Sequence, residues 1–274
     1  MSDDQVLIKL FNESTKRSIK WKKYFSIYEK LFYKYKNKKI TFVEIGILDG
    51  GSLEIWKKYF GKHSRIIGID NNPECKKFQN DDYEIFIGSQ SNPDFWKKFY
   101  KDVGKVDIIL DDGGHTNDQQ IISLINSIQN INDGGLHVVE DVHSSYQKQY
   151  GNPYKYSFIN FSKKTIDDIN STFPNLKKFD YKLNQSIYSI EFFESIVAFK
   201  IDRNLCYENK LLENKGLKSN NNDTTLDEGF VNFRNKFKYL YKYKLVQKIE
   251  RIFIKFFYRY KSKKLKKFFK WINW

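Results

Sequence analysis

Apolar residues along the chain form two kinds of pattern, short continuous runs and longer segments with helical spacing. Short runs that are apolar throughout are typical of strands buried on both faces, and strands that alternate with helices favour a mostly parallel sheet. The sequence therefore predicts an α/β fold for most of the chain. The predicted strands cover residues 40–45, 65–70, 83–88, 106–110 and 136–139.

The ends of the chain depart from this alternation. Residues 1–40 predict a helical segment, in which apolar residues from Ile19 to Phe32 recur at spacings of three and four. The apolar runs 187–191 and 195–200 are too close together for a helical crossover, so we expect the sheet to end in an antiparallel pair. Asn132–Gly135 (Asn-Asp-Gly-Gly) predicts a turn. The predicted organisation is a helical segment 1–40, a sheet domain 41–206, a polar linker 207–230 and a tail 231–274.

The tail carries nearly all of the excess positive charge. Of the 48 basic and 33 acidic residues, 15 basic ones and a single acid, Glu250, lie between Arg234 and Trp274. Positions 1–233 therefore hold 33 basic against 32 acidic residues and are close to neutral. An AT-rich genome explains abundant lysine but does not explain the scarcity of acids in the tail, so an anionic partner for the tail is indicated.

The tail also predicts a basic amphipathic helix. Such a helix suits a membrane interface with anionic head groups. The alternatives are a helix that packs on the body or on a partner, and single-stranded nucleic acid, which ranks lower because the body carries no nucleic-acid motif. The apolar stripe consists of Leu245, Ile249, Ile252, Phe256 and Tyr260, then Leu265, Phe268 and Ile272, with Trp271 and Trp274 at the end.

Cysteine content and hydropathy narrow the class of protein. Two cysteines, Cys75 and Cys206, indicate no disulfide framework and exclude a thiolate metal site. The acidic start of the chain lacks the apolar segment of a signal peptide, and no run of about 18 apolar residues is long enough to span a membrane. We expect a cytoplasmic protein, peripheral at the inner face of the membrane if the tail docks there.

A glycine turn, Gly46–Gly51, follows the first predicted strand, and such a turn lets a ligand approach the backbone and the start of the next helix. The spacing differs from the dinucleotide pattern G-x-G-x-x-G. The acid Glu44 disfavours a pyrophosphate and suits a cationic ligand, such as the amino group and sulfonium of S-adenosylmethionine. Asp70 ends the second strand, where it can accept hydrogen bonds from ribose hydroxyls. The cofactor-side candidates are Glu44, Gly46, Ser52, Asp70, Gly88 and Gln90.

Two neighbouring predicted strands end on acids that a histidine follows, in residues 111–115 (Asp-Asp-Gly-Gly-His) and 140–143 (Glu-Asp-Val-His). The carboxyl ends of parallel strands meet at one edge, so these side chains are expected to converge. Neither motif holds a lysine, so the carboxylates repel each other unless a cation lies between them, and oxygen ligands favour Mg²⁺, Mn²⁺ or Ca²⁺ over Zn²⁺. The predicted ligands are Asp112, Glu140 and Asp141; the catalytic candidates are His115, as a base, and His143 at the same rim.

These motifs resemble one known family, the class I methyltransferases of the macrolide-sugar type. That family includes mycinamicin and macrocin sugar O-methyltransferases and the related cephalosporin-hydroxylase-like proteins. The resemblance covers roughly residues 17–202 and is most specific at residues 111–115 and 139–146. Its other parts are residues 20–28 (Lys-Trp-x-x-Tyr-Phe-x-Ile-Tyr), Val43–Gly46, Gly68–Asp70 and Gly88–Gln90.

The resemblance implies a Rossmann-like methyltransferase fold with a seven-stranded sheet, S-adenosylmethionine as methyl donor and bound Mg²⁺. By position it implies Asp112, Glu140 and Asp141 as metal ligands and His115 as general base. It also adds Asp111 to the cofactor side. The macrolide enzymes carry a longer N-terminal region that helps to build the oligomer and the substrate pocket, and the printed sequence has no counterpart. A homo-oligomer is therefore compatible with the resemblance but not carried over, and the basic tail falls outside it.

Together these features predict an enzyme that transfers a methyl group to a sugar hydroxyl, with Mg²⁺ or Mn²⁺. A surface glycan (polysaccharide) or a nucleotide-linked sugar is the expected acceptor, because a tail on the membrane would place the enzyme beside glycan assembly. Other acceptors are a phosphate, a carboxylate or a phenolic diol, although a lysine base is expected for the diol and residues 111–115 contain none. A non-catalytic scaffold of the same fold is the alternative from another class. His63 and His137 are expected to be structural.

Overall fold

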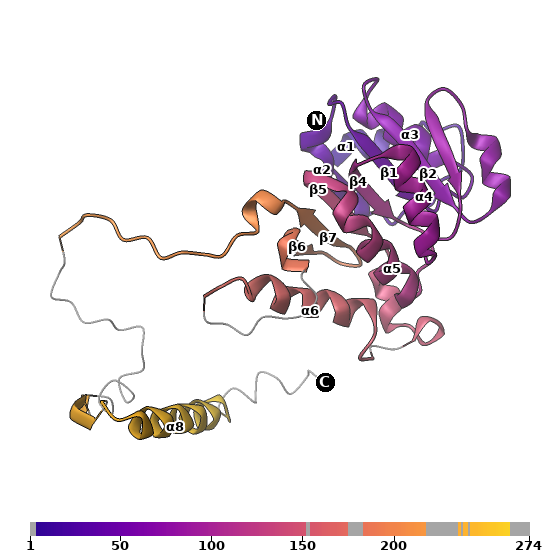
Figure 1. The fold of residues 1–274 in the computed structure, drawn as a ribbon. Helices are drawn as coiled ribbons and strands as arrows, with labels where there is room; N and C mark the ends of the chain where they lie inside the picture. Colours follow the sequence, from indigo (N-terminus) through magenta and orange to yellow (C-terminus); the bar gives the residue numbers. More distant parts are fainter. Residues whose placement is uncertain are drawn as a thin grey trace. The chain divides into compact units, whose positions relative to one another are not determined.

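The computed structural model describes residues 4–151, 154–174, 183–217, 235–236, 238–240 and 242–263 (Figure 1). It separates the chain into two compact units, Met1–Leu211 and Leu212–Trp274. The helical N-terminal segment belongs to the first unit and packs on the sheet there. The predicted boundaries at residues 206 and 230 stay predictions, and most of the predicted linker lies outside the described residues.

The first unit is built around a seven-stranded sheet in the order β3-β2-β1-β4-β5-β7-β6. Strands β1 to β5 pair in parallel, whereas β7 pairs antiparallel with both β5 and β6. The predicted fold class and the antiparallel C-terminal pair are confirmed. The strands are β1 (Thr41–Ile45), β2 (Arg65–Asp70), β3 (Tyr83–Ile87), β4 (Val106–Asp111), β5 (Ile131–Val139), β6 (Ile187–Phe192) and β7 (Val197–Ile201).

Helices cover both faces of the sheet, which explains why its strands are apolar throughout. Alternate strand residues point to opposite faces, so Phe42 packs with one group of helices and Val43 with the other. The Phe42 face is covered by α1 (Asp4–Asn12), α2 (Tyr24–Phe32) and α3 (Gly51–Phe60). The Val43 face is covered by α4 (Pro93–Val103), α5 (Asn117–Ser127) and α6 (Phe158–Asn170).

Two local predictions are wrong. The predicted turn Asn132–Gly135 is part of β5, where a register shift lets a longer stretch of β5 oppose β4 and accommodates the glycines. The helical spacing from Ile19 onward does not begin a helix there, because α2 starts at Tyr24 and both Ile19 and Trp21 are exposed. The segment before α2 instead crosses toward the carboxyl edge of the sheet, where Lys20 contacts residues of β1, β4 and β5 or the loops that follow them.

The second unit contains helix α8 (Lys244–Ser262). Its apolar residues Leu245, Ile249, Ile252 and Phe256 follow one face at spacings of three and four, and all four side chains are exposed. This part of the predicted stripe is confirmed as helical, whereas Leu265, Phe268, Trp271, Ile272 and Trp274 lie outside the described residues. Among the helices that the structure describes, none combines the length and the apolar character needed to span a membrane.

Candidate active site

The predicted functional residues meet at the carboxyl edge of the parallel strands. The loops that follow these strands bond to one another: Asp112 N–H donates to Ile45 C=O at 3.0 Å, and Glu140 N–H donates to Asp111 C=O at 2.9 Å. Gly46, with φ of +82°, lies so close to the next loop that a Cβ atom there would be 2.1 Å from the Asp112 carbonyl oxygen. Only glycine fits at this position, and the glycine turn and the acidic motif therefore form one surface.

A cavity of about 410 Å³, which we name the Asp70 cavity, opens at this surface beside β1, β2 and β4. Its lining includes four of the seven predicted cofactor residues, Gly46, Asp70, Gly88 and Gln90, together with the predicted metal ligand Asp112. The size is within the range of sites for small-molecule ligands. The remaining lining residues are Ile45, Leu48, Asn71, Ser89, Gly113, Gly114 and Gln119.

Side chains around the Asp70 cavity are held by backbone hydrogen bonds. The two carboxylate oxygens of Asp70 accept from the N–H groups of Ile47 at 3.1 Å and Asn72 at 2.9 Å. The amide oxygen of Gln90 accepts from Gly114 N–H at 2.7 Å, and its nitrogen donates to both oxygens of Asp111. Gln90 therefore joins the loop after β3 to the loop after β4 in the wall of the cavity.

The other three predicted cofactor residues, Glu44, Ser52 and Asp111, do not line this cavity. Glu44 is fully buried and accepts a hydrogen bond from Ser52 Oγ at 2.5 Å. Asp111 is buried against Gln90 and Ser123, and burial raises the pKa of its carboxyl to about 7. These acids support the loops from behind the surface on which a ligand would lie.

Lys20 lies among the carboxylates, so the expectation that no lysine accompanies them is wrong. Its ammonium nitrogen is 2.5 Å from Asp112 Oδ2, 3.1 Å from Glu140 Oε2 and 3.5 Å from Glu44 Oε1. The side chain is only 5% exposed. Burial alone would lower the pKa of Lys20, but the charges of the three carboxylates outweigh burial and hold that pKa well above its usual value. Lys20 therefore supplies the positive charge that these three carboxylates share.

The Glu140 carboxylate contacts Lys20. It accepts hydrogen bonds from Lys20 and from the buried hydroxyl of Tyr28. Burial, followed by repulsion from Asp112, raises the pKa of the Glu140 carboxyl well above its usual value. Two of the three metal ligands implied by the resemblance, Asp112 and Glu140, are thus paired with Lys20.

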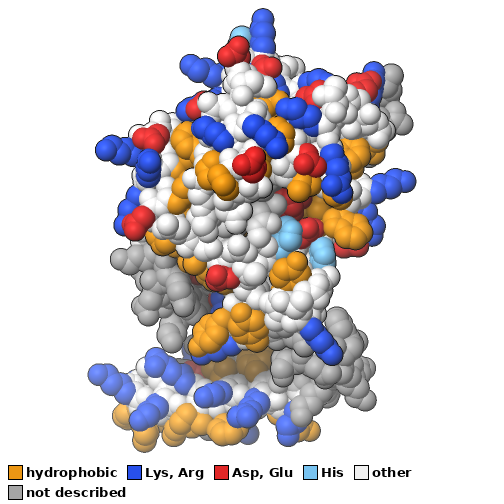
Figure 2. All heavy atoms as spheres, turned by 90° about the vertical axis from the view of Figure 1, so that its right-hand side faces the viewer, with side chains coloured by type: hydrophobic (Ala, Val, Ile, Leu, Met, Phe, Trp, Pro, Cys, Tyr) orange, Lys and Arg blue, Asp and Glu red, His pale blue; other side chains and the backbone are white. Residues whose placement is uncertain are grey.

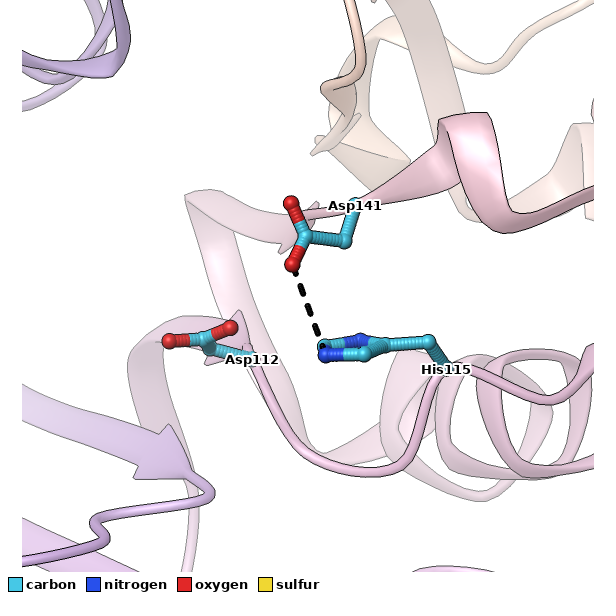
Figure 3. A group of neighbouring side chains, drawn as sticks. All are labelled: Asp112, His115 and Asp141. Carbon is cyan, nitrogen blue, oxygen red and sulfur yellow. Dashed lines mark ion pairs between the residues drawn. The ribbon is translucent and has the colours of Figure 1, made fainter. Parts of the chain in front are cut away.

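A second group on the same edge offers donors for a metal ion. Asp112, His115 and Asp141 each present one ligand atom, and the three atoms lie within 4.8 Å of one another. Figure 3 shows the His115 ring reaching toward the two carboxylates, with Nε2 3.4 Å from Asp141 Oδ2. The two carboxylate oxygens suit Mg²⁺ or Mn²⁺, whereas an imidazole ligand is more typical of Zn²⁺ or Fe²⁺.

Asp141 joins this group to the second histidine. Its backbone is in the left-handed region with φ of 52°, and its Oδ1 accepts a 2.5 Å hydrogen bond from Tyr24. His143 Nδ1 lies 3.8 Å from the same oxygen and 2.5 Å from Ser195 Oγ. His115 and His143 therefore approach opposite oxygens of one carboxylate, and either can exchange a proton near it.

The two remaining histidines lie apart from the edge, as expected. His63 is exposed in the loop between α3 and β2. His137 is fully buried in β5, where burial lowers the pKa of its ring from 6.5 to about 3. Neither ring nitrogen of His137 has a hydrogen-bond partner, so it is a neutral core residue.

The strand order, the glycine turn and the acidic edge together define an α/β fold of the class I methyltransferase type. Two solved structures of a methyltransferase from the mycinamycin biosynthetic pathway share this fold, one in complex with Mg and SAH and one with Mg, SAH and mycinamycin VI. Their TM-scores are 0.63 and 0.64, with 22% identity over 74% of this chain and 55% and 54% of theirs.

The sequence is similar to several sugar O-methyltransferases, which confirms the predicted resemblance. It is 28% identical over 156 residues to a rhamnosyl tetracenomycin-C 2′-O-methyltransferase of Streptomyces olivaceus, covering 53% of this chain and 41% of that protein. It is 30% identical over 133 residues to mycinamicin VI 2″-O-methyltransferase of Micromonospora griseorubida, covering 45% and 32%. The chain thus spans less than half the length of these relatives. No known protein-family model matches the chain.

Sequence reasoning did not assign roles to Lys20, Tyr24, Tyr28 and Ser195. The first three belong to the N-terminal stretch of the resemblance, residues 20–28, so a signal was present without an indicated role. Ser195 lies in the turn between β6 and β7, and no motif marks it. All four side chains bond to carboxylates at the edge or to groups that do.

Proposed function

We propose that this protein transfers a methyl group from S-adenosylmethionine to a hydroxyl of a sugar. The observation that carries the proposal is the convergence of Asp112, His115 and Asp141 beside the Asp70 cavity. The fold and the sugar O-methyltransferases among the relatives support the same reaction. A surface glycan or a nucleotide-linked sugar is the proposed acceptor.

On the cofactor side, the Asp70 carboxylate would accept the ribose hydroxyls of S-adenosylmethionine. The backbone around Gly46 and Gly88 would allow the ligand to approach closely, and Gln90 would keep the loop walls in place. The amino group and the sulfonium carry positive charge, so Asp112 at the cavity wall suits them electrostatically. Glu44, Ser52 and Asp111 would act by fixing the loops rather than by contact.

On the acceptor side, Asp112 and Asp141 are the proposed ligands of Mg²⁺ or Mn²⁺. For the predicted set to hold the ion, Lys20 would have to release the carboxylates of Asp112 and Glu140. A divalent cation bound here would lower the pKa of an acceptor hydroxyl that it contacts. His115 would take the proton of that hydroxyl, and Asp141 would orient the ring and stabilise its positive charge. The alternative is that His115 is a ligand, which leaves His143 as the base.

Calorimetry with S-adenosylmethionine, with and without Mg²⁺, tests the proposed function. Binding with micromolar affinity is the expected result, and absence of binding in both conditions would overturn the proposal. His115→Ala and His143→Ala, compared in single-turnover methyl transfer, separate the two bases. The base variant should lose about 10²–10⁴-fold in rate while its affinity for S-adenosylmethionine stays unchanged.

The position of Lys20 bears on the alternative of a phenolic diol acceptor, for which a lysine base is expected. Lys20 contacts Asp112, as such a base would need to do. The surrounding carboxylates, however, hold its pKa well above the usual value, and its side chain is almost entirely buried. Its ammonium is paired with three carboxylates, and the relatives are sugar O-methyltransferases, so the sugar acceptor remains the better proposal.

For the tail, we propose docking of α8 on an anionic membrane surface. The exposed apolar face carries Leu245, Ile249 and Phe256, and Lys248 and Lys255 lie on the same helix to meet lipid head groups. Flotation with phosphatidylglycerol vesicles tests this in the full chain. Ile249→Asp with Phe256→Asp should abolish co-flotation, and unchanged partitioning of this variant would overturn the docking.

A further inference from the structure

A second cavity of about 470 Å³ lies at the same edge, next to Asp141 on the side of Tyr24 and Ser195, and we name it the Trp21 cavity. It is formed by the segment before α2, the short helix η4 (Val142–Tyr146) and the turn between β6 and β7. Among its lining residues, the proposed function uses only His143. Its lining residues are Trp21, Lys22, Lys23, Tyr24, His143, Gln147, Glu194 and Ser195.

Trp21 gives this cavity an aromatic wall. The side chain is 61% exposed, although tryptophan is among the most costly residues to leave in water. Its ring meets the His143 ring edge to face, with 6.0 Å between the centroids, so its orientation is supported from one side. Figure 2 shows histidine, carboxylate and hydrophobic side chains gathered together on one face of the molecule.

Hydrogen bonds hold Ser195 and His143 in place in the cavity lining. Ser195 Oγ accepts a hydrogen bond from Tyr24 at 2.9 Å and lies 2.5 Å from His143 Nδ1. This contact directs the opposite ring nitrogen of His143 away from Ser195. Gln147 adds an amide to the lining, and Glu194 adds a carboxylate that is paired with Lys23, so hydroxyl groups of a ligand would find both donors and acceptors.

Backbone strain points to the same place. Four residues other than glycine have positive φ among the residues described, and two of them are Asp141 (52°) and Ser195 (64°). Such conformations cost free energy and are found mainly where the surrounding structure needs a side chain in one position. Here both residues direct their side chains toward Tyr24 and His143, at the boundary of the Trp21 cavity.

We infer that the Trp21 cavity binds the pyranose ring of the acceptor, with one C–H face of the sugar stacked on Trp21. A pyranose has an apolar face and a rim of hydroxyls, and the cavity offers an aromatic face beside polar groups. His143 and Ser195 position the ring, and Asp141 connects them to His115. The inference rests on the proposed sugar methylation and assigns the acceptor to this side of the edge, opposite the Asp70 cavity.

Saturation-transfer difference NMR with methyl glycosides of rhamnose, glucose and galactose tests the inference on the full-length protein. At least one glycoside should show signals from its ring C–H protons. Trp21→Ala should lower these signals at least fivefold, and Trp21→Tyr should retain them. Tyr33→Ala removes another exposed aromatic ring that is absent from the cavity lining, and this control should behave like the wild type.

Equal signals in Trp21→Ala and wild type would overturn the inference, as would the absence of signals with every glycoside. Trp21 is exposed, so its removal leaves the core intact, and near-ultraviolet circular dichroism checks the fold. Calorimetry with S-adenosylmethionine on the same variants keeps the two proposals apart. If Trp21→Ala loses the glycoside signals and still binds S-adenosylmethionine normally, the sugar site and the proposed methyl transfer are both supported. If the wild type binds glycosides through Trp21 but does not bind S-adenosylmethionine, only the proposed methyl transfer is overturned.

Discussion

The Asp70 cavity and the Trp21 cavity lie at one edge of the sheet but are built in different ways. Loops that each follow their own strand form the first, so short motifs such as residues 111–115 specify it locally. The second depends on contacts between distant segments: Tyr24 bonds to Asp141 and Ser195, which are 117 and 171 residues away.

The two cavities therefore depend on the sheet to different degrees. The Asp70 cavity lies at the ends of the parallel strands, so its lining follows from the sheet itself. The Trp21 cavity is formed by the N-terminal segment and the turn between β6 and β7, outside the strands of the sheet. Lys20 connects the two cavities. It belongs to the segment that carries Trp21, and its ammonium pairs with Glu44, Asp112 and Glu140.

The largest expected effect comes from Lys20→Met, which removes the cation that pairs with these three carboxylates. We expect the free energy of unfolding to fall by about 3–5 kcal/mol, because Glu44 and Glu140 stay buried without their cation. Urea denaturation in EDTA measures the change. Adding Glu140→Gln removes one buried charge and should restore part of the loss. A cost below about 1 kcal/mol for Lys20→Met alone would show that the segment is held by packing and not by charge.

A smaller, pH-dependent effect should come from the core beneath the edge. The pKa of His137 is about 3 in the folded protein against 6.5 ordinarily, so the unfolded chain binds a proton that the folded chain excludes. The free energy of unfolding that the neutral His137 ring contributes is therefore fully present above pH 6.5. This contribution is lost as the pH falls toward 3. At pH 5 the loss should be about 2 kcal/mol.

His137→Leu should remove this part of the pH dependence, as denaturation curves at pH 7.5 and pH 5 would show. The variant also removes two buried nitrogens without partners. If it retains the wild-type pH dependence, the acid sensitivity belongs to the carboxylates of the edge rather than to the core.

Asp70→Ala tests the proposed role of the Asp70 cavity in binding S-adenosylmethionine. Loss of a carboxylate that would bind ribose hydroxyls should weaken S-adenosylmethionine binding about tenfold, or about 1.4 kcal/mol. Calorimetry measures the affinity, with Trp21→Ala as the matched variant from the other cavity, which should bind S-adenosylmethionine normally. Equal losses in both variants would mean that the two cavities do not act separately.

The smallest effect is expected at Lys23, which forms an ion pair with Glu194 on the surface. Both side chains are more than two thirds exposed, so Lys23→Met should change the free energy of unfolding by less than about 0.5 kcal/mol. Urea denaturation beside Lys20→Met provides the check. A large effect would show that charge anywhere in this segment, and not burial at Lys20, stabilises the edge.

Much of the sheet could be predicted from local pattern alone. The strands at residues 65–70 and 106–111 are buried on both faces, so their continuous apolar runs were sufficient to predict strands. The pattern failed where a local signal competed with pairing partners. Asn132–Gly135 has turn chemistry, but β4 and β7 hold β5 in register on either side and absorb the extra residues.

Prediction of the site was limited in the same way. The positions of Asp70, Gln90 and Asp112 follow from the strands that precede them, and all three line one cavity. The direction of an acidic side chain does not follow from its position. Glu44 and Asp111 were expected to face the cofactor, yet their hydrogen-bond partners Ser52 and Ser123 lie on the helices behind them.

The sequence by itself determined the alternation of strands and helices, the glycine turn at Gly46 and the acids that end β4 and β5. These features depend on neighbouring residues, through apolar period and backbone geometry. Only the tertiary structure decided that Lys20 would pair with Asp112 and Glu140, that Asp112 would also meet His115 and Asp141, and that Trp21 would lie beside His143. These contacts join segments distant along the chain, and their energies depend on burial and charge that exist only once the sheet has formed.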